Sequence, residues 1–260
     1  MSTVAARSGQ HAWEVGARAG YAASGLVHVL IGVLALQLAL GSGEGSADQS
    51  GAFQQIAQTS FGALVLWVSV VAFVALGAWQ AAAALSGAAG ETSDRVKSGA
   101  KAVVYLALAG TAFSVVQGGG SSSSGQTTSL TGQLMQAPAG RVLVGAVGVA
   151  VVVVGGYHVY KGLAKKFLED LQRLPSGTTG RVARTAGVVG YAAKGVALVV
   201  VGVLFVVAAL HANPDEASGL DGALQALREA PAGPVLLVLV ALGLVAFGGY
   251  CAVRARFGRL

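Results

Sequence analysis

Six stretches of about twenty residues lack acidic side chains and carry almost no basic ones, and polar segments separate them. A helix of about twenty apolar residues crosses the ~30 Å hydrocarbon core of a bilayer. A membrane β-barrel would instead show segments of about ten residues in which polar and apolar side chains alternate. That alternation is absent, so the pattern predicts six membrane-spanning helices. They are expected at residues 20–40, 62–85, 99–117, 142–160, 187–210 and 234–253.

The second, fourth and sixth spans share one internal spacing. Each starts at a glycine and reaches a small-residue and aromatic tripeptide fifteen residues later. The three copies are Gly62 to Gly77-Ala78-Trp79, Gly140 to Gly155-Gly156-Tyr157, and Gly233 to Gly248-Gly249-Tyr250. Self-similarity at a fixed spacing marks a repeated structural unit. The chain is therefore predicted to contain three copies of one two-helix hairpin.

The hairpins divide the chain into consecutive segments. We expect a cytoplasmic segment at 1–17, repeats at 18–90, 91–174 and 175–260, and outer loops at 41–61, 118–141 and 211–233. Because each hairpin crosses the membrane twice, all three copies have the same orientation, as in parallel repeats related by an axis along the membrane normal. The predicted fold class is an all-α membrane protein whose six helices form a quasi-threefold bundle about that normal.

Small residues recur at seven-residue steps on the odd-numbered spans. A seven-residue step returns to nearly the same face of a helix, so each odd span presents a smooth stripe to a neighbour. Helices associate in lipid largely through such close packing. The glycines of these stripes are therefore interpreted as packing positions, principally Gly25, Gly32, Gly195 and Gly202.

The outer loops also resemble one another. In the third, Ser218 with Asp221 predicts a capping box, and Leu220, Leu224 and Leu227 fall on one helical face. We expect a short amphipathic helix there, and similar helices in the other two loops. Residues 118–125 are rich in glycine and serine and predict a flexible linker.

Composition agrees with a membrane protein: 54% of the residues are hydrophobic and 11% are charged, where soluble domains have about 25% charged residues. All 17 Lys and Arg except Arg141 and Arg228 lie on one predicted side. The positive-inside rule places that side, with both termini, in the cytoplasm. The net charge of +6 therefore indicates topology, and no nucleic-acid partner is expected.

Several side chains are expected at the cytoplasmic edge of the membrane. Trp79, Tyr157 and Tyr250 are interpreted as headgroup-level anchors. Lys194 is expected to extend its long side chain to the interface between membrane and cytoplasm. Anionic lipid headgroups are a candidate partner for the basic flank after the fourth span. Its residues are Lys161, Lys165 and Lys166.

The opening Gly-Tyr-Ala-Ala-x-Gly of residues 20–25 and 190–195, and the Pro-x-Gly that leads to Gly-Gly-Tyr, resemble the bacterial domain of unknown function 1206 membrane-protein family. The resemblance covers nearly the whole chain and agrees in motif, spacing and copy number. The second unit departs from it, since Ser98-Gly99-Ala100-Lys101 replaces the tyrosine-bearing opening. The resemblance implies a location in the bacterial inner membrane, and it supplies no accepted activity and no catalytic residues.

The sequence is compatible with three functions. The first is a non-enzymatic structural, accessory or partner-binding membrane protein, favoured because the predicted spans contain no Asp or Glu, which proton relays and ion-coupled transporters usually use. The second is a small transporter or channel with a path along the pseudo-threefold axis. The polar positions that could line such a path are Ser24, His28, Gln80 and His158.

The third function is a haem protein that would use His28 and His158, but they are expected at different depths in the membrane. No motif of a hydrolase or of a metal site is found. The sequence therefore predicts no catalytic residue, no metal and no cofactor. The direction in which the four polar positions face would separate the first two functions.

Overall fold

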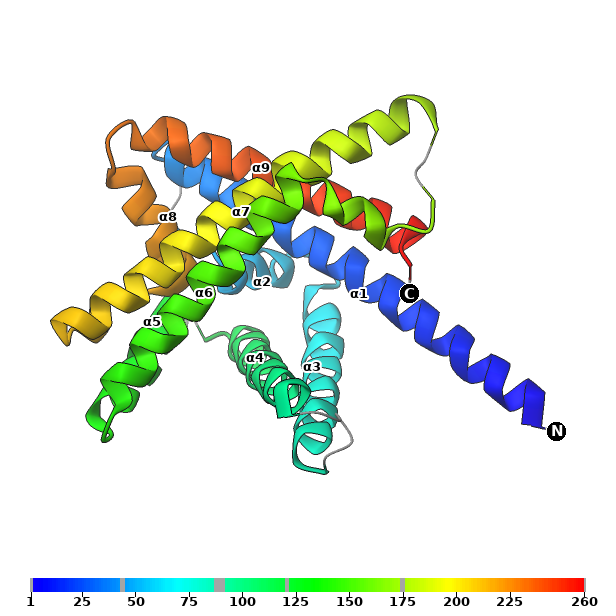
Figure 1. Cartoon of the computed structure of the whole chain (residues 1–260), viewed down its shortest axis with the longest axis horizontal. Coiled ribbons are helices and arrows are strands. Elements are labelled where there is room, and N and C mark those ends of the chain that lie inside the picture. The colour runs from blue at the N-terminus through cyan, green and yellow to red at the C-terminus, as the bar shows by residue number, and fades with distance from the viewer. Residues whose placement is uncertain (1, 43–44, 87–91, 120–121, 174–175, 260) are drawn as a thin grey trace. The chain divides into compact units, whose positions relative to one another are not determined.

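The computed structural model describes residues 2–42, 45–86, 92–119, 122–173 and 176–259. These residues form nine α-helices and two short 3₁₀ helices, and they contain no β-strand (Figure 1). In chain order the elements are α1 (Ser2–Ala39), α2 (Gln49–Ala57), α3 (Gly62–Ser86), α4 (Thr92–Val116), α5 (Ser123–Gln136), α6 (Gly140–Leu163), η1 (Lys166–Asp170), α7 (Gly177–His211), η2 (Pro214–Glu216), α8 (Gly219–Glu229) and α9 (Gly233–Phe257).

Six of these helices are long and apolar enough to cross a membrane, which confirms the predicted number of spans. They are α3, α4, α6, α7, α9 and the part of α1 at Gly20–Ala39. The prediction was too short at one point, because α7 begins ten residues before the apolar stretch at 187–210. The all-helical multi-pass membrane fold is thus confirmed.

The chain folds as two compact units. Unit 1 contains residues 1–47 and 127–260, and unit 2 contains residues 48–126. In unit 2, α3 packs along α4, and α2 contacts both helices. In unit 1, α1 packs along α9, α6 packs along α7, and α7 also contacts α9.

The closest helix pairs join different copies of the repeat. The second helix of one copy packs on the first helix of another: α3 on α4 within unit 2, and α6 on α7 and α9 on α1 within unit 1. In every copy, the second helix therefore packs on the first helix of a different copy. The quasi-threefold arrangement of all six helices stays a prediction.

Glycines face each other where these helices meet. A Cβ atom added to Gly155 would lie 2.8 Å from the carbonyl oxygen of Gly195, and one added to Gly195 would lie 2.6 Å from that of Gly155. Gly148 and Gly202 have the same relation two turns away, at 2.8 and 2.6 Å. The backbones of α6 and α7 are thus in direct contact, as small-residue interfaces in membranes allow.

The pair formed by α1 and α9 has the same kind of seam. An added Cβ at Gly25 would lie 2.9 Å from the carbonyl oxygen of Gly248, and one at Gly32 would lie 2.8 Å from that of Ala241. The stripe of small residues on the odd spans therefore packs against the glycine that ends the fifteen-residue spacing of an even span. This contact gives the repeated spacing a physical reason.

Short helices occur in all three predicted outer loops, namely α2, α5 and α8, as expected. Two details of the prediction were wrong. The side chain of Ser218 makes no capping hydrogen bond to α8, and the Asp221 carboxylate accepts from the backbone N–H of Ala47 at 2.7 Å. The expected linker is partly helical, because α5 already begins at Ser123.

The glycine that starts each even span closes a tight turn after the short helix. The N–H of Gly140 donates to the carbonyl of Ala137 at 2.9 Å. A Cβ on Gly140 would collide with the carbonyl oxygen of Leu134 near the end of α5. Gly62 and Gly233 make the equivalent turn and would collide with Ile56 and Arg228. The turn therefore requires a residue without a side chain.

Candidate functional site

A cluster of buried side chains in unit 1 lies where α6 and α9 end and α7 begins. We call it the aromatic cap. Its members are Phe167, Leu171, Tyr191, Phe247, Tyr250 and Cys251. Tyr191 comes from α7, three members come from α9, and Phe167 and Leu171 come from the segment after α6, so only the tertiary fold brings them together.

Tyr250 is at the centre of the aromatic cap, with no exposed surface. Its hydroxyl donates to the backbone carbonyl of Phe167 at 2.8 Å. The Phe167 ring lies edge-on to Tyr250 and stacks on Tyr191, with centroid distances of 5.1 and 5.6 Å. Gly187 makes room for this ring, because an added Cβ there would collide with it. The segment after α6 is thereby fixed to α7 and α9.

An ionic cluster closes the edge of the aromatic cap. The Asp170 carboxylate forms ion pairs with Lys161 at 2.7 Å and with Arg254 at 3.1 Å, and all three side chains are largely buried. Arg254 also donates to the Tyr191 hydroxyl at 3.4 Å and places its guanidinium 4.5 Å from the centre of the Tyr21 ring. Removing one partner of such a buried group leaves a charge unpaired, which is costly.

The end of the chain joins the same segment. The N–H of Gln172 donates to the carbonyl of Phe257, and the N–H of Arg259 donates to that of Asp170, both at 2.8 Å. Leu171 and Gly258 form an isolated antiparallel bridge. The residues after α9 are therefore tied to the residues after α6.

The burial of Tyr250 differs from the expectation that it anchors the protein at the headgroups. Trp79 and Tyr157 are each 53% exposed and can serve as such anchors, whereas Tyr250 is fully buried. The physical reason is Phe167, which covers the ring that would otherwise face lipid. A phenylalanine next to acidic residues in an otherwise basic segment was the only signal of this contact in the sequence.

The polar positions predicted inside the spans lie in both units. His28 and His158 each use Nδ1 to hydrogen-bond a carbonyl one turn earlier in their own helix, those of Ser24 at 2.7 Å and Val154 at 2.8 Å. Gln80 is buried in unit 2. The described residues contain no group of three His, Cys, Asp or Glu side chains that could hold a metal ion.

Both histidines also contact rings of the aromatic cap. The centroid of His28 lies 4.8 Å from that of Phe247, and the His158 ring stacks on Tyr191 at 5.8 Å. The ammonium group of Lys194 lies 4.4 Å from the centre of the Phe247 ring. Lys194 therefore points into the packing between helices, whereas the sequence predicted that its side chain extends to the membrane interface. His28 and Lys194 thus form a small polar group between α1, α7 and α9, whereas His158 belongs to α6 and lies against Tyr191 of α7.

The basic flank proposed to meet lipid is not uniform. Lys161 is engaged with Asp170, whereas Lys165 and Lys166 are exposed. Lys166 lies 5.0 Å from the centre of the Tyr160 ring, and a hydrogen bond with that side chain raises the pKa of its ammonium group. Two of the three lysines can thus present a full positive charge to an anionic surface.

The model of the DUF1206 family (Domain of Unknown Function) matches the chain three times, at residues 19–87, 96–165 and 189–258. The chain is also similar to an uncharacterized protein, YxxB, of Bacillus subtilis (strain 168). The two are 28% identical over 244 residues, which cover 91% of this chain and 88% of the relative. No solved structure matches the chain. The threefold match agrees with the three glycine spacings, and the relative is bacterial.

Proposed function

Since the chain belongs to the DUF1206 family of unknown function, we propose from its geometry that it is a non-enzymatic structural, accessory or partner-binding protein. The glycine seams carry this proposal. Backbones in contact along α6 and α7, and along α1 and α9, leave no space for a water-filled path between the paired helices. Such packing suits a rigid scaffold whose outer helix faces remain free to bind lipid or another membrane protein.

The polar groups inside the spans support the same proposal. His28 and His158 hydrogen-bond their own helices, and so does Ser69, whose hydroxyl donates to the carbonyl of Val65 at 2.8 Å. A polar group in hydrocarbon must be satisfied within the protein. These groups are satisfied locally and require no substrate.

We place the protein in the bacterial plasma membrane with both termini in the cytoplasm. The distribution of Lys and Arg supports this orientation, because cytoplasmic segments are enriched in these residues. The aromatic cap would then lie at the cytoplasmic end of unit 1. Lys165 and Lys166 would face the anionic headgroups of the inner leaflet.

One observation favours a second function, that of a small transporter or channel along the pseudo-threefold axis. Lys194 and His28 both lie against Phe247 between three helices of unit 1. Ionisable groups inside membrane spans commonly mark a substrate or proton path. In the scaffold proposal the same groups only stabilise the packing of α1, α7 and α9.

Cysteine accessibility separates the two functions. On a Cys251→Ser background, single cysteines are introduced through residues 24–35 of α1 and 195–206 of α7 and treated with a membrane-impermeant maleimide. Vesicles of both orientations are used, and Asp215→Cys in an exposed loop is the positive control. The scaffold proposal requires protection beyond the first turn of both helices. Labelling with helical periodicity deep into both spans would refute it and support a hydrated path.

A further inference from the structure

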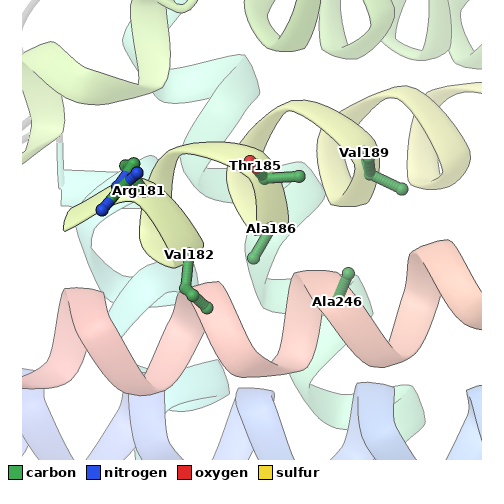
Figure 2. Close-up of a pocket in the computed structure, with 6 residues that line it drawn as sticks. All are labelled: Arg181, Val182, Thr185, Ala186, Val189 and Ala246. Atoms are coloured by element: carbon green, nitrogen blue, oxygen red, sulfur yellow. The ribbon is translucent and has the colours of Figure 1, made fainter. Parts of the chain in front are cut away.

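A groove of about 480 Å³ opens on the side of unit 1 between α7 and α9. Its walls are formed by Arg181, Val182, Thr185, Ala186, Val189 and Ala246. Figure 2 shows Val182 and Ala186 of α7 and Ala246 of α9 with their side chains directed into the space between the two helices. The groove exists because two of these three side chains are only methyl groups.

Polarity changes along the length of the groove. Arg181 is at one end, Thr185 follows about one turn later, and Val189 is at the other end (Figure 2). Val189 is eight positions after Arg181 in the same helix, a distance of about 12 Å along the helix axis at 1.5 Å per residue. Arg181 precedes the apolar stretch at 187–210, and Val189 lies within it. The groove therefore runs from the edge of the membrane into the hydrocarbon region.

The charged end of the groove is available to a ligand. Arg181 is exposed, and it makes no hydrogen bond or ion pair with any other residue in the described part of the chain. A guanidinium group has five donors in a planar fork that matches a phosphate group. The apolar end offers Val189 and Ala246 to a hydrocarbon chain.

We propose that this groove binds one anionic phospholipid, with its phosphate at Arg181 and part of one acyl chain along Ala186, Val189 and Ala246. Charge selects the occupant, because Arg181 is a cation and is the one charged side chain among the described residues of the lining. The position of the groove in the membrane favours a phospholipid. Its lining changes from charged to apolar at the depth where lipid headgroups give way to acyl chains. The site is separate from Lys165 and Lys166, and it is compatible with either function proposed above.

Binding can be measured by native mass spectrometry of the full chain in mild detergent, with phosphatidylglycerol or phosphatidylcholine of identical acyl chains. Arg181→Gln removes the charge, and Ala246→Leu fills the apolar end. Arg228→Gln, a basic residue of α8, is the matched control for net charge. Circular dichroism checks the helical content of each variant.

We expect phosphatidylglycerol to bind more tightly than phosphatidylcholine to the unaltered chain. Loss of one charge-assisted contact should weaken phosphatidylglycerol binding on the order of tenfold in Arg181→Gln, and Arg228→Gln should leave it unchanged. Ala246→Leu should weaken both lipids, since it removes space for the acyl chain. The proposal is overturned if the two lipids bind equally, if the two arginine variants behave alike, or if filling the groove changes nothing.

Discussion

Two adjacent glycines in α6 should respond in opposite ways to one added methyl group. Gly155 faces α7, where a new Cβ would lie 2.8 Å from both the carbonyl oxygen of Gly195 and the backbone nitrogen of Val199. Gly156 has no atom within 4 Å of the same position. Alanine should therefore destabilise the protein at Gly155 and be tolerated or stabilising at Gly156.

The magnitude follows from the two terms that the substitution changes. Replacing a helical glycine by alanine favours the helix by about 0.8–1.0 kcal/mol at either position. At Gly155 the atoms in the way belong to the backbone of α7, so the helices must separate, and overpacking of this kind costs about 1–3 kcal/mol. The helix term cancels when Gly155→Ala is compared with Gly156→Ala, so their stabilities should differ by about 1–3 kcal/mol.

The comparison can be made by unfolding the purified chain with sodium dodecyl sulfate in mixed micelles, followed by far-ultraviolet circular dichroism. Gly155→Ala should unfold at a lower mole fraction of sodium dodecyl sulfate than Gly156→Ala. Equal midpoints for the two variants would refute the seam, because only the contact with α7 distinguishes the two positions.

Three further outcomes are expected. Tyr250→Phe should lower the free energy of unfolding by about 1–3 kcal/mol, because it leaves the Phe167 carbonyl without its buried donor. Asp221→Ala should destabilise the chain by a similar amount of about 1–3 kcal/mol and speed hydrogen exchange at the Ala47 amide, which loses its acceptor. Cys251 is 3% exposed, so a water-soluble maleimide should label it only after unfolding.

Matched controls separate these effects from a general response to substitution. Tyr157→Phe removes the hydroxyl of a tyrosine that is 53% exposed and should leave stability unchanged. Asp215→Asn changes an exposed acidic side chain in the same loop region as Asp221 and should not alter exchange at Ala47. If either control behaves like its buried counterpart, the contacts described for Tyr250 or Asp221 do not stabilise the fold.

Much of the helical architecture could be predicted from the sequence because it depends on local properties. The length of each apolar stretch determines whether a helix can cross a membrane, and the glycine and proline signals mark where a span begins. The short helix α8 was predicted for the same reason, from the spacing of its leucines. The capping of α8 was not, since the partner of Asp221 is Ala47, 174 residues away.

Less of the aromatic cap could be predicted from the sequence. Tyr250 looks like an interfacial anchor because it lies at the end of a span, and Tyr157 at the equivalent position is indeed exposed. What distinguishes them is Phe167, which lies 83 residues before Tyr250 and reaches it only after α6, α7 and α9 have packed. No local pattern carries that information.

The sequence by itself determined the number of spans, the three copies of the hairpin and the positions at which helices could approach closely, because each of these depends on neighbouring residues. Only the tertiary structure decided which helices meet, since one stripe of small residues is chemically equivalent to another. It also decided that Asp170, Lys161 and Arg254 form one buried ionic cluster. Such groups are stable only when packing brings opposite charges together and removes water from around them.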